Sequence, residues 1–210
     1  MRLFKLQETP LSIQGNAAAF LNGISSNTLD VPLNAFLNQH GRVIATFRQQ
    51  KKSDDEFLIF VPASAVANVL KHLERYAQLS HVLIVPLAQN VYMDLESSQA
   101  LMLPQELANS VSSDEFVLFR LKHNIPLMGI DYQADEFILN VHPYNYVSYT
   151  KGCFLGQEPV AKVHNRSQPA RKLIVQFEDL CSPDQAAAMT SKALDPVSGR
   201  VKGFIFVSNK

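Results

Sequence analysis

The residues best suited to chemistry lie in one stretch, Lys151-Gly152-Cys153-Phe154-Leu155-Gly156-Gln157-Glu158. Glycines on both sides of Cys153 permit tight turns and a close approach of the backbone to a ligand. Pro159 follows at a position where a helix can begin, because the first turn of a helix does not need that amide hydrogen. A thiol just before a helix favours the thiolate, so Cys153 is a candidate reactive or metal-coordinating residue. Its spacing alone favours the other interpretation, a small buried apolar side chain.

The polar neighbours of this thiol each allow two interpretations. Glu158 and Lys162 are four residues apart with the acid first, the orientation that favours an ion pair within a helix, and ligand binding is the equal alternative. Gln157 could read the edge of a heterocycle or could cap the helix. Between Lys151 and Lys172, five cations stand against the single carboxylate of Glu158, a local excess of positive charge that would attract an anionic ligand.

The chain has too few cysteines to build a metal centre or a disulfide framework by itself. Its two cysteines, Cys153 and Cys181, cannot supply the four thiolates of a cluster site, so any cluster contact of Cys153 must be shared with a partner. His40, His142 and His164 have no partners at metal-ligand spacing, and we expect them to be solvated or core histidines. Low cysteine usage is typical of the reducing cytoplasm.

Composition indicates an ordinary globular protein. Of the 210 residues, 47% are hydrophobic and 18% are charged, and the formal net charge is zero, which argues against a nucleic-acid or membrane binder held by overall charge. The N-terminus lacks the apolar core of a secretion signal. The most apolar run, residues 57–70, is interrupted by polar residues and is too short for a membrane span. We therefore expect a cytoplasmic protein without a membrane partner.

The hydrophobic pattern predicts an α+β fold in which helices cover one face of an antiparallel sheet. Gln39-His40-Gly41 separates two β-rich runs and indicates a hairpin. We expect residues 97–113 to mix helix and loop, residues 136–141 to be extended or looped, and residues 182–200 to form a short helix and loops. The predicted helices cover residues 17–21 and 64–80, and the predicted strands cover residues 11–13, 35–38, 42–47, 57–61, 82–85, 91–95, 116–121, 173–177 and 203–207.

The stretch from Lys151 to Lys162, followed by Arg166 and Arg171-Lys172-Leu173, closely resembles the lysine-glycine-cysteine signature of the folate-binding YgfZ family. Members of this family are related to the glycine cleavage T-protein and to mitochondrial iron–sulfur assembly factors. Upstream, residues 20–27 are similar to the family's N-terminal helix and asparagine loop, residues 38–43 to its hairpin, residues 120–131 to its arginine strand, and residues 136–138 to the segment before the signature. The resemblance covers roughly residues 3 to 175.

This resemblance implies a T-protein-like α+β fold that binds tetrahydrofolate or a related folate in a central cavity. It implies a folate-binding region over residues 1–171, built from two intertwined α+β subdomains, and a C-terminal β region over residues 172–210 in which the family's barrel is reduced or absent. Cys153 would be the signature thiol, the candidate catalytic residue and a cluster ligand shared with a partner. The implied folate-binding residues are Asn27, Arg120, Lys151, Gln157, Glu158 and Arg166.

Two departures from the T-protein pattern narrow the expected function. Ala45 and Thr46 stand where the T-protein carries an aspartate that assists methylene transfer, and Lys122 stands where a glutamate meets the pterin. A lysine cannot accept the hydrogen bonds that a carboxylate takes from pterin N–H groups. We therefore expect an auxiliary protein that supports assembly or repair of iron–sulfur clusters in client enzymes, including tRNA-modifying ones, rather than an aminomethyltransferase. The basic stretch Lys162–Lys172 could contact tRNA.

Overall fold

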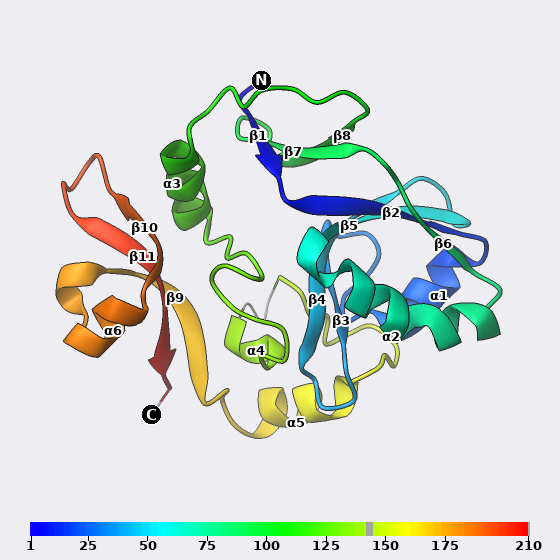
Figure 1. Ribbon diagram of the computed structural model, residues 1–210. Helices are drawn as coiled ribbons and strands as arrows, with labels where there is room; N and C mark the ends of the chain where they lie inside the picture. The colour runs from blue at the N-terminus through cyan, green and yellow to red at the C-terminus, as the bar shows by residue number, and fades with distance from the viewer. Residues whose placement is uncertain (142–144, 210) are drawn as a thin grey trace.

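A five-stranded antiparallel sheet organises the N-terminal half of the protein (Figure 1). In the computed structural model, which describes residues 1–141 and 145–209, its strand order is β3-β4-β5-β2-β6. The β3–β4 pair is the predicted hairpin, and it turns at Gly41, whose φ is +71°. The strands are β2 (Glu8–Gln14), β3 (Leu33–Leu37), β4 (Val43–Lys51), β5 (Glu56–Pro62) and β6 (Leu83–Pro86).

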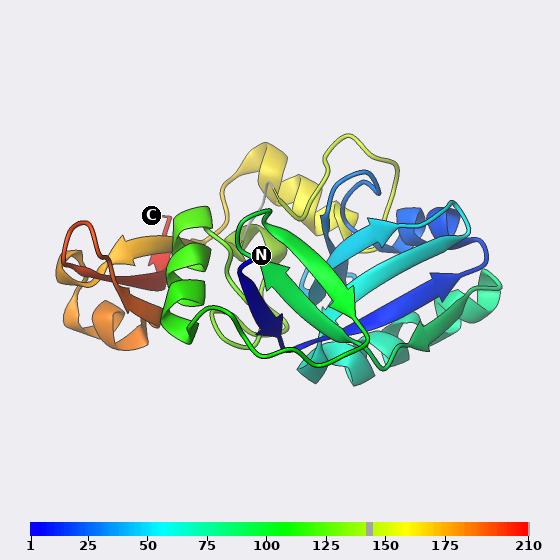
Figure 2. The ribbon, with the colours of Figure 1, turned by 90° about the horizontal axis from the view of Figure 1, so that it is seen from above.

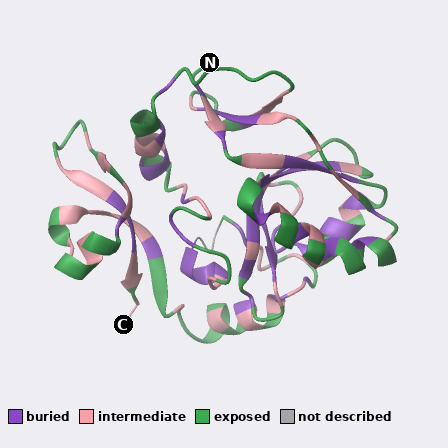
Figure 3. Cartoon of the chain, in the orientation of Figure 1, coloured by how far each residue is buried: buried purple, intermediate pink, exposed green. Residues whose placement is uncertain are grey.

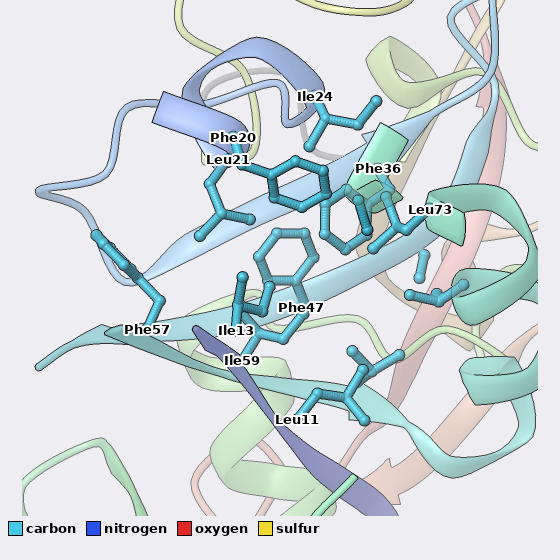
Figure 4. Close-up of a cluster of buried hydrophobic side chains, with 14 of the residues drawn as sticks. Leu11, Ile13, Phe20, Leu21, Ile24, Phe36, Phe47, Phe57, Ile59 and Leu73 are labelled. Carbon is cyan, nitrogen blue, oxygen red and sulfur yellow. The ribbon is translucent and has the colours of Figure 1, made fainter. Parts of the chain in front are cut away.

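Two helices cover one face of this sheet, as the sequence predicted. They are α1 (Ala17–Ile24) and α2 (Val66–Leu79), the latter preceded by the short turn η1 (Ala63–Ala65). Side chains of a strand alternate between its two faces: Ile59 packs among the residues of the helices, whereas Phe60 faces the opposite side. Figure 4 shows the helix-facing core, in which each fully buried large apolar side chain contributes about 1.5–3 kcal/mol.

A second, three-stranded sheet lies against the other face through Leu58 and Phe60. It consists of β1 (Leu3–Leu6), β7 (Asn90–Asp94) and β8 (Gln99–Leu103) in the order β1-β7-β8. The presence of β8 corrects the expectation of helix and loop over residues 97–113. A tight turn at Ser98, whose φ is +58°, brings the chain back to pair with β7. The segment forms a strand because of this pairing, although its own hydrophobic pattern is weak.

The predicted strand over residues 116–121 is wrong, because these residues lie in the helix α3 (Ser113–His123). Ser112 caps this helix by accepting a hydrogen bond from the Glu115 amide, and the Glu115 carboxylate accepts one from the Ser112 amide. Such a reciprocal cap satisfies two amides that a helix would otherwise leave unpaired. The apolar run looked like a strand because α3 contacts apolar partners on opposite sides, with Phe116 in one core and Leu121 in another.

The C-terminal residues form a third sheet with the strand order β10-β11-β9. Figure 2 shows this sheet at one end of the molecule, beyond α3. Strands β9 (Arg171–Phe177) and β11 (Val201–Ser208) were predicted, as was the short helix α6 (Pro183–Ala188), whereas the edge strand β10 (Thr190–Leu194) was missed because its residues are largely polar. The turn η2 (Glu178–Leu180) follows β9. The division of the chain at residue 171 stays a prediction.

The signature region joins the sheets near the centre of the molecule. The short helix α4 (Ile138–Val141) lies where an extended or looped segment was predicted. It packs beside the hairpin, as does the predicted helix α5 (Gln157–Arg166). Figure 3 shows α4 and the adjoining hairpin strands as largely buried, whereas α5 is partly exposed. The exposed residues of α5 include Lys162 and Arg166. Within residues 1–141 and 145–209, no helix has the length and apolar character needed to cross a membrane.

Candidate functional site

Lys151 points inward and joins the signature loop to the asparagine loop. Its Nζ donates hydrogen bonds to the backbone oxygens of Ser25 at 2.7 Å and Asn27 at 2.9 Å, and it lies 5.3 Å from the centre of the Phe154 ring. Loss of solvent around the ammonium lowers the pKa of Lys151 to about 8. The structure therefore brings together two predicted site residues, Lys151 and Asn27, through the backbone of the latter.

Gly156 fixes the approach of the signature loop to the hairpin. It precedes α5 with a φ of +82°, and a Cβ atom at this position would lie 2.3 Å from the backbone oxygen of Asn38. No other residue type fits this position, since both the left-handed backbone and the lack of space exclude a side chain. A Cβ atom on Gly152, by contrast, would have no neighbour within 4 Å among the described residues, so only one of the two signature glycines is constrained by packing.

Buried amides hold the asparagine loop in place. Asn27 Nδ2 donates to the backbone oxygens of Leu33 at 3.0 Å and Asn145 at 2.9 Å, and its Oδ1 accepts from the Thr28 amide. Asn34 and Gln49 extend this network through a side-chain hydrogen bond of 3.1 Å. The side chain of Asn27 is thus engaged with the backbone, and its predicted contact with a folate stays a prediction.

The signature thiol is accessible. Cys153 is exposed and unpaired in the described part of the chain, and Cys181 is partly exposed. Gln157 Oε1 accepts a long hydrogen bond of 3.4 Å from the Phe154 amide, which lies in the loop before α5. This contact does not cap the helix, since α5 has no side-chain cap among the described residues.

The exposed face of α5 carries charge that reaches solvent. Glu158 and Lys162 are both exposed, and the ion pair expected between them is not among the salt bridges of the described residues. Arg166 and Lys172 are exposed as well, whereas Arg171 pairs with Glu136 at 2.5 Å. The cations from Lys162 to Lys172 therefore lie apart from the inward Lys151.

Arg120 lies elsewhere, at the contact between α3 and β10. Its Nη1 donates to Asp131 Oδ2 at 2.6 Å and its Nη2 to Ser191 Oγ at 2.5 Å. Asp131 also accepts from the Leu127 amide and from the hydroxyls of Thr190 and Ser191. We call this set of contacts the Arg120–Asp131 joint. The side chains of its ion pair are 3% and 0% exposed, and within the described residues they are occupied by protein partners.

A cavity of about 350 Å³ lies between the five-stranded sheet and the segment 126–130. None of the six residues implied for folate binding lines it. Its polar lining includes Glu8 from β2, Thr46 and Arg48 from β4, and Tyr146 just before the signature. We call this the β2–β4 cavity, and its apolar walls include Phe47, Pro62, Pro126, Leu127 and Met128.

Hydroxyl groups occupy the position where the T-protein pattern has an acid. Ala45 is fully buried, and the Thr46 hydroxyl hydrogen-bonds to the Tyr132 hydroxyl. Burial raises the pKa of Tyr132 and of Tyr146, which keeps both phenols protonated at neutral pH. The neighbours of Thr46 are therefore neutral hydroxyl groups, and β4 supplies no carboxylate that could act as a base at this position.

The carboxylate of the cavity comes from another strand. Glu8 Oε1 forms an ion pair with Arg48 Nη1, whereas Glu8 Oε2 is enclosed and has no hydrogen-bond partner in the described structure. Burial raises the pKa of Glu8 above its ordinary 4.5, although the Arg48 charge opposes this shift. Sequence reasoning missed both residues. The alternation of β4, which places Thr46 and Arg48 on the same face, was the one available signal.

The histidines give no sign of a metal site. No group of three or more His, Cys, Asp or Glu side chains with metal-binding geometry occurs in residues 1–141 and 145–209. His164 stacks on Tyr149 with 3.6 Å between ring centres, His40 is exposed, and His142 lies outside the described residues.

No protein-family model matches the chain. The solved glycine cleavage system aminomethyltransferase T from Bartonella henselae superposes with a TM-score of 0.75 over 98% of this chain and 78% of that structure, at 13% sequence identity. The chain therefore has the T-protein fold, an α+β architecture of antiparallel sheets and packed helices.

Two curated proteins are similar in sequence. One is described as a mitochondrial iron-sulfur cluster assembly factor IBA57 homolog of Dictyostelium discoideum, 21% identical over 197 residues, which span 72% of this chain and 48% of the relative. The other is an uncharacterized protein of Haemophilus influenzae, 24% identical over 165 residues, with 68% and 59% covered. The chain thus spans about half the length of the curated relatives it matches. It shares its fold with the glycine cleavage T-protein and is similar in sequence to a protein described as an iron-sulfur cluster assembly factor homolog.

Proposed function

We propose that the chain is a cytoplasmic, folate-binding auxiliary protein that supports assembly or repair of iron–sulfur clusters in client enzymes, including tRNA-modifying ones. The observation that carries this proposal is the geometry of the signature loop: Lys151 is anchored inward on the backbone of Ser25 and Asn27, while Cys153 is left exposed. The printed description of the Dictyostelium relative supports the same function.

An exposed, unpaired thiol suits a shared ligand. Because the described residues contain no set of metal ligands around Cys153, this thiol would complete a site together with cysteines of an assembly protein or a client enzyme. The anchoring of Lys151 and the packing of Gly156 fix the backbone on both sides of Cys153, so the thiol is presented from a rigid support.

The residues of the β2–β4 cavity fit the ring of a folate. Its volume of about 350 Å³ lies within the range of small-molecule sites. The apolar walls formed by Pro62, Leu127 and Met128 suit a flat ring, and the unpartnered Glu8 Oε2 can accept from ring N–H groups. When bound, a reduced folate would supply one-carbon chemistry, and the residues of this chain would bind and orient its ring.

The second candidate function is aminomethyl transfer, which is favoured by the fold shared with an aminomethyltransferase. The hydroxyl of Thr46 cannot act as the base that an aspartate supplies. Glu8 does place a carboxylate in the cavity, but its Oε1 is bound to Arg48. Methylene transfer from an aminomethyl donor to tetrahydrofolate, lost in Cys153→Ser, would favour this alternative.

The exposed cations Lys162, Arg166 and Lys172 form a surface that could contact tRNA. Phosphate contacts weaken steeply with salt. We expect tRNA binding at low salt that decreases in a variant with all three changed to glutamine. Absence of binding by the wild type at low salt would dismiss this partner and leave the rest of the proposal intact.

The proposed function is tested by complementation in cells that lack the corresponding gene and show reduced activity of iron–sulfur enzymes. We expect Cys153→Ser to lose most of the rescue, because the exposed thiol is the shared ligand, and the matched Cys181→Ser to rescue like the wild type. Immunoblots that show equal protein levels provide the control. Equal rescue by the two variants would remove the role assigned to Cys153.

A further inference from the structure

The β2–β4 cavity contains a carboxylate of which only half is used by the protein. The Glu8 side chain is 10% exposed, and its Oε1 is paired with Arg48, whose side chain is 14% exposed. Its Oε2 has no hydrogen-bond partner among the described residues. A buried polar atom without a partner costs about 1–3 kcal/mol. Because Glu8 lines the β2–β4 cavity, a hydrogen-bond donor bound in that cavity could remove this cost.

We propose that Glu8 binds the N–H donors of a flat, amino-substituted heterocycle in the β2–β4 cavity, with Arg48 holding its carboxylate in place. This inference rests on the proposed function, because it identifies the residue that would recognise the ring of the folate. Nothing in the signature, and no residue implied by family resemblance, points to Glu8.

The chemistry of the lining defines the ligand class. An ionised carboxylate only accepts hydrogen bonds, so the groups that face Glu8 Oε2 must be donors. Arg48 Nη1 already neutralises the carboxylate through Oε1, which removes the need for a cationic ligand. The apolar walls of Pro62, Leu127 and Met128 favour a flat body without charge. An aminopyrimidine edge, in which an amino group lies next to a ring N–H, combines these features.

The position of Glu8 also explains how the cavity could do without the glutamate that Lys122 replaces. Lys122 is exposed on α3 and does not line the β2–β4 cavity. Glu8 enters the cavity from β2, about one hundred residues earlier in the chain. Because β2 is a strand of the five-stranded sheet, it holds this carboxylate on a regular element rather than on a loop, so the recognising group can be supplied from β2.

The rival explanation is a purely structural ion pair whose second oxygen binds an internal water. The two explanations differ in their consequences for ligand binding. We would titrate the wild-type protein by calorimetry with 5-formyltetrahydrofolate and with its analogue that carries a methyl in place of the 2-amino group. We expect the analogue to bind on the order of 10- to 100-fold more weakly, because Glu8 loses a donor.

The same titrations with Glu8→Gln complete the comparison. We expect 5-formyltetrahydrofolate to bind this variant on the order of 10- to 100-fold more weakly, and the difference between the two ligands to largely disappear. Glu74→Gln, at an exposed position of α2, is the matched control and should bind as the wild type does. If Glu8→Gln fails to fold, Glu8→Gln/Arg48→Met, which removes both buried charges, takes its place with the same expected result.

Each outcome decides the question. Equal affinity of the wild type for the two ligands would overturn the role of Glu8, as would unchanged affinity in Glu8→Gln, and either result would leave folate binding and the proposed function standing. Failure of the wild type to bind 5-formyltetrahydrofolate at all would overturn this inference together with the ligand part of the proposed function.

Discussion

Two buried arginine–carboxylate pairs lie in this molecule, and they differ in how completely the carboxylate is satisfied. Asp131 accepts hydrogen bonds on both oxygens, from Arg120, an amide and two hydroxyls. Glu8 uses one oxygen for Arg48 and leaves the other without a partner in the described residues. The first pair joins α3 to β10, and its Arg120 also lines a second cavity of about 500 Å³. The second pair lines the β2–β4 cavity.

This difference separates a group that holds the fold from a group that can bind a ligand. At the Arg120–Asp131 joint, Arg120 Nε is the one ion-pair atom that lacks a partner among the described residues, and the ion-pair side chains are almost completely enclosed. A ligand in the cavity beside Arg120 would meet a guanidinium whose two Nη atoms are already hydrogen-bonded to Asp131 and Ser191. At Glu8, the enclosed oxygen without a partner costs free energy for as long as no hydrogen-bond donor binds to it. Burial and charge alone would have ranked the two sites equally.

The largest effect is expected from breaking the joint. Asp131→Ala leaves Arg120 charged, buried and unpaired, so we expect the free energy of unfolding to fall by about 3–5 kcal/mol, as measured by urea denaturation. The control is Asp179→Ala, which removes the partner of the more exposed Arg200 and should cost less than about 1 kcal/mol. Similar losses in the two variants would contradict the structural importance of the joint.

A smaller effect is expected at the cavity. Glu8→Gln should lower the free energy of unfolding by about 1–3 kcal/mol, because Arg48 loses its ionic partner. Adding Arg48→Met removes the unpaired charge and should restore most of this loss. The same urea experiment measures both variants. A double variant that is less stable than the single one would show that Arg48 has structural contacts that the pair does not explain.

The smallest effect concerns pH. Because burial raises the pKa of Glu8 above 4.5, the folded protein keeps a proton that the unfolded chain has already released. The contribution of Glu8 is thus present below about pH 4.5 and is lost as pH rises through the native pKa. We expect the free energy of unfolding of the wild type, minus that of Glu8→Gln, to decrease over this window. An increase would show that Arg48 outweighs burial.

The sequence predicted the parts of the fold whose local pattern agrees with their environment. The alternation of apolar and polar residues in the β3–β4 hairpin and the helical spacing of apolar residues in α2 were sufficient to predict these elements, since each element buries one face. The apolar run around Phe116 was wrongly predicted as a strand, because α3 contacts two cores and its apolar residues do not follow a helical period. The Ser112–Glu115 cap was the sequence feature that indicated a helix. The edge strand β10 was missed because polar residues carry little pattern.

The candidate site was predicted only in part, for a related reason. The signature loop could be found because its residues are contiguous in sequence. The Glu8–Arg48 pair could not, because its partners are forty residues apart and meet only when β2 and β4 take their places on either side of β5. Arg120 was chosen by resemblance, and the structure shows its described contacts within the joint.

The most direct test of this comparison is the rise in melting temperature caused by a reduced folate in the wild type, Glu8→Gln and Thr190→Val, a variant that removes one hydrogen bond to Asp131. At about one hundred times its dissociation constant, the ligand should add about 2.7 kcal/mol to the stability of the wild type. We predict that Thr190→Val melts at a lower temperature but keeps the full rise, and that Glu8→Gln loses most of it. Equal rises in Glu8→Gln and the wild type would contradict the assignment of the β2–β4 cavity as the ligand site.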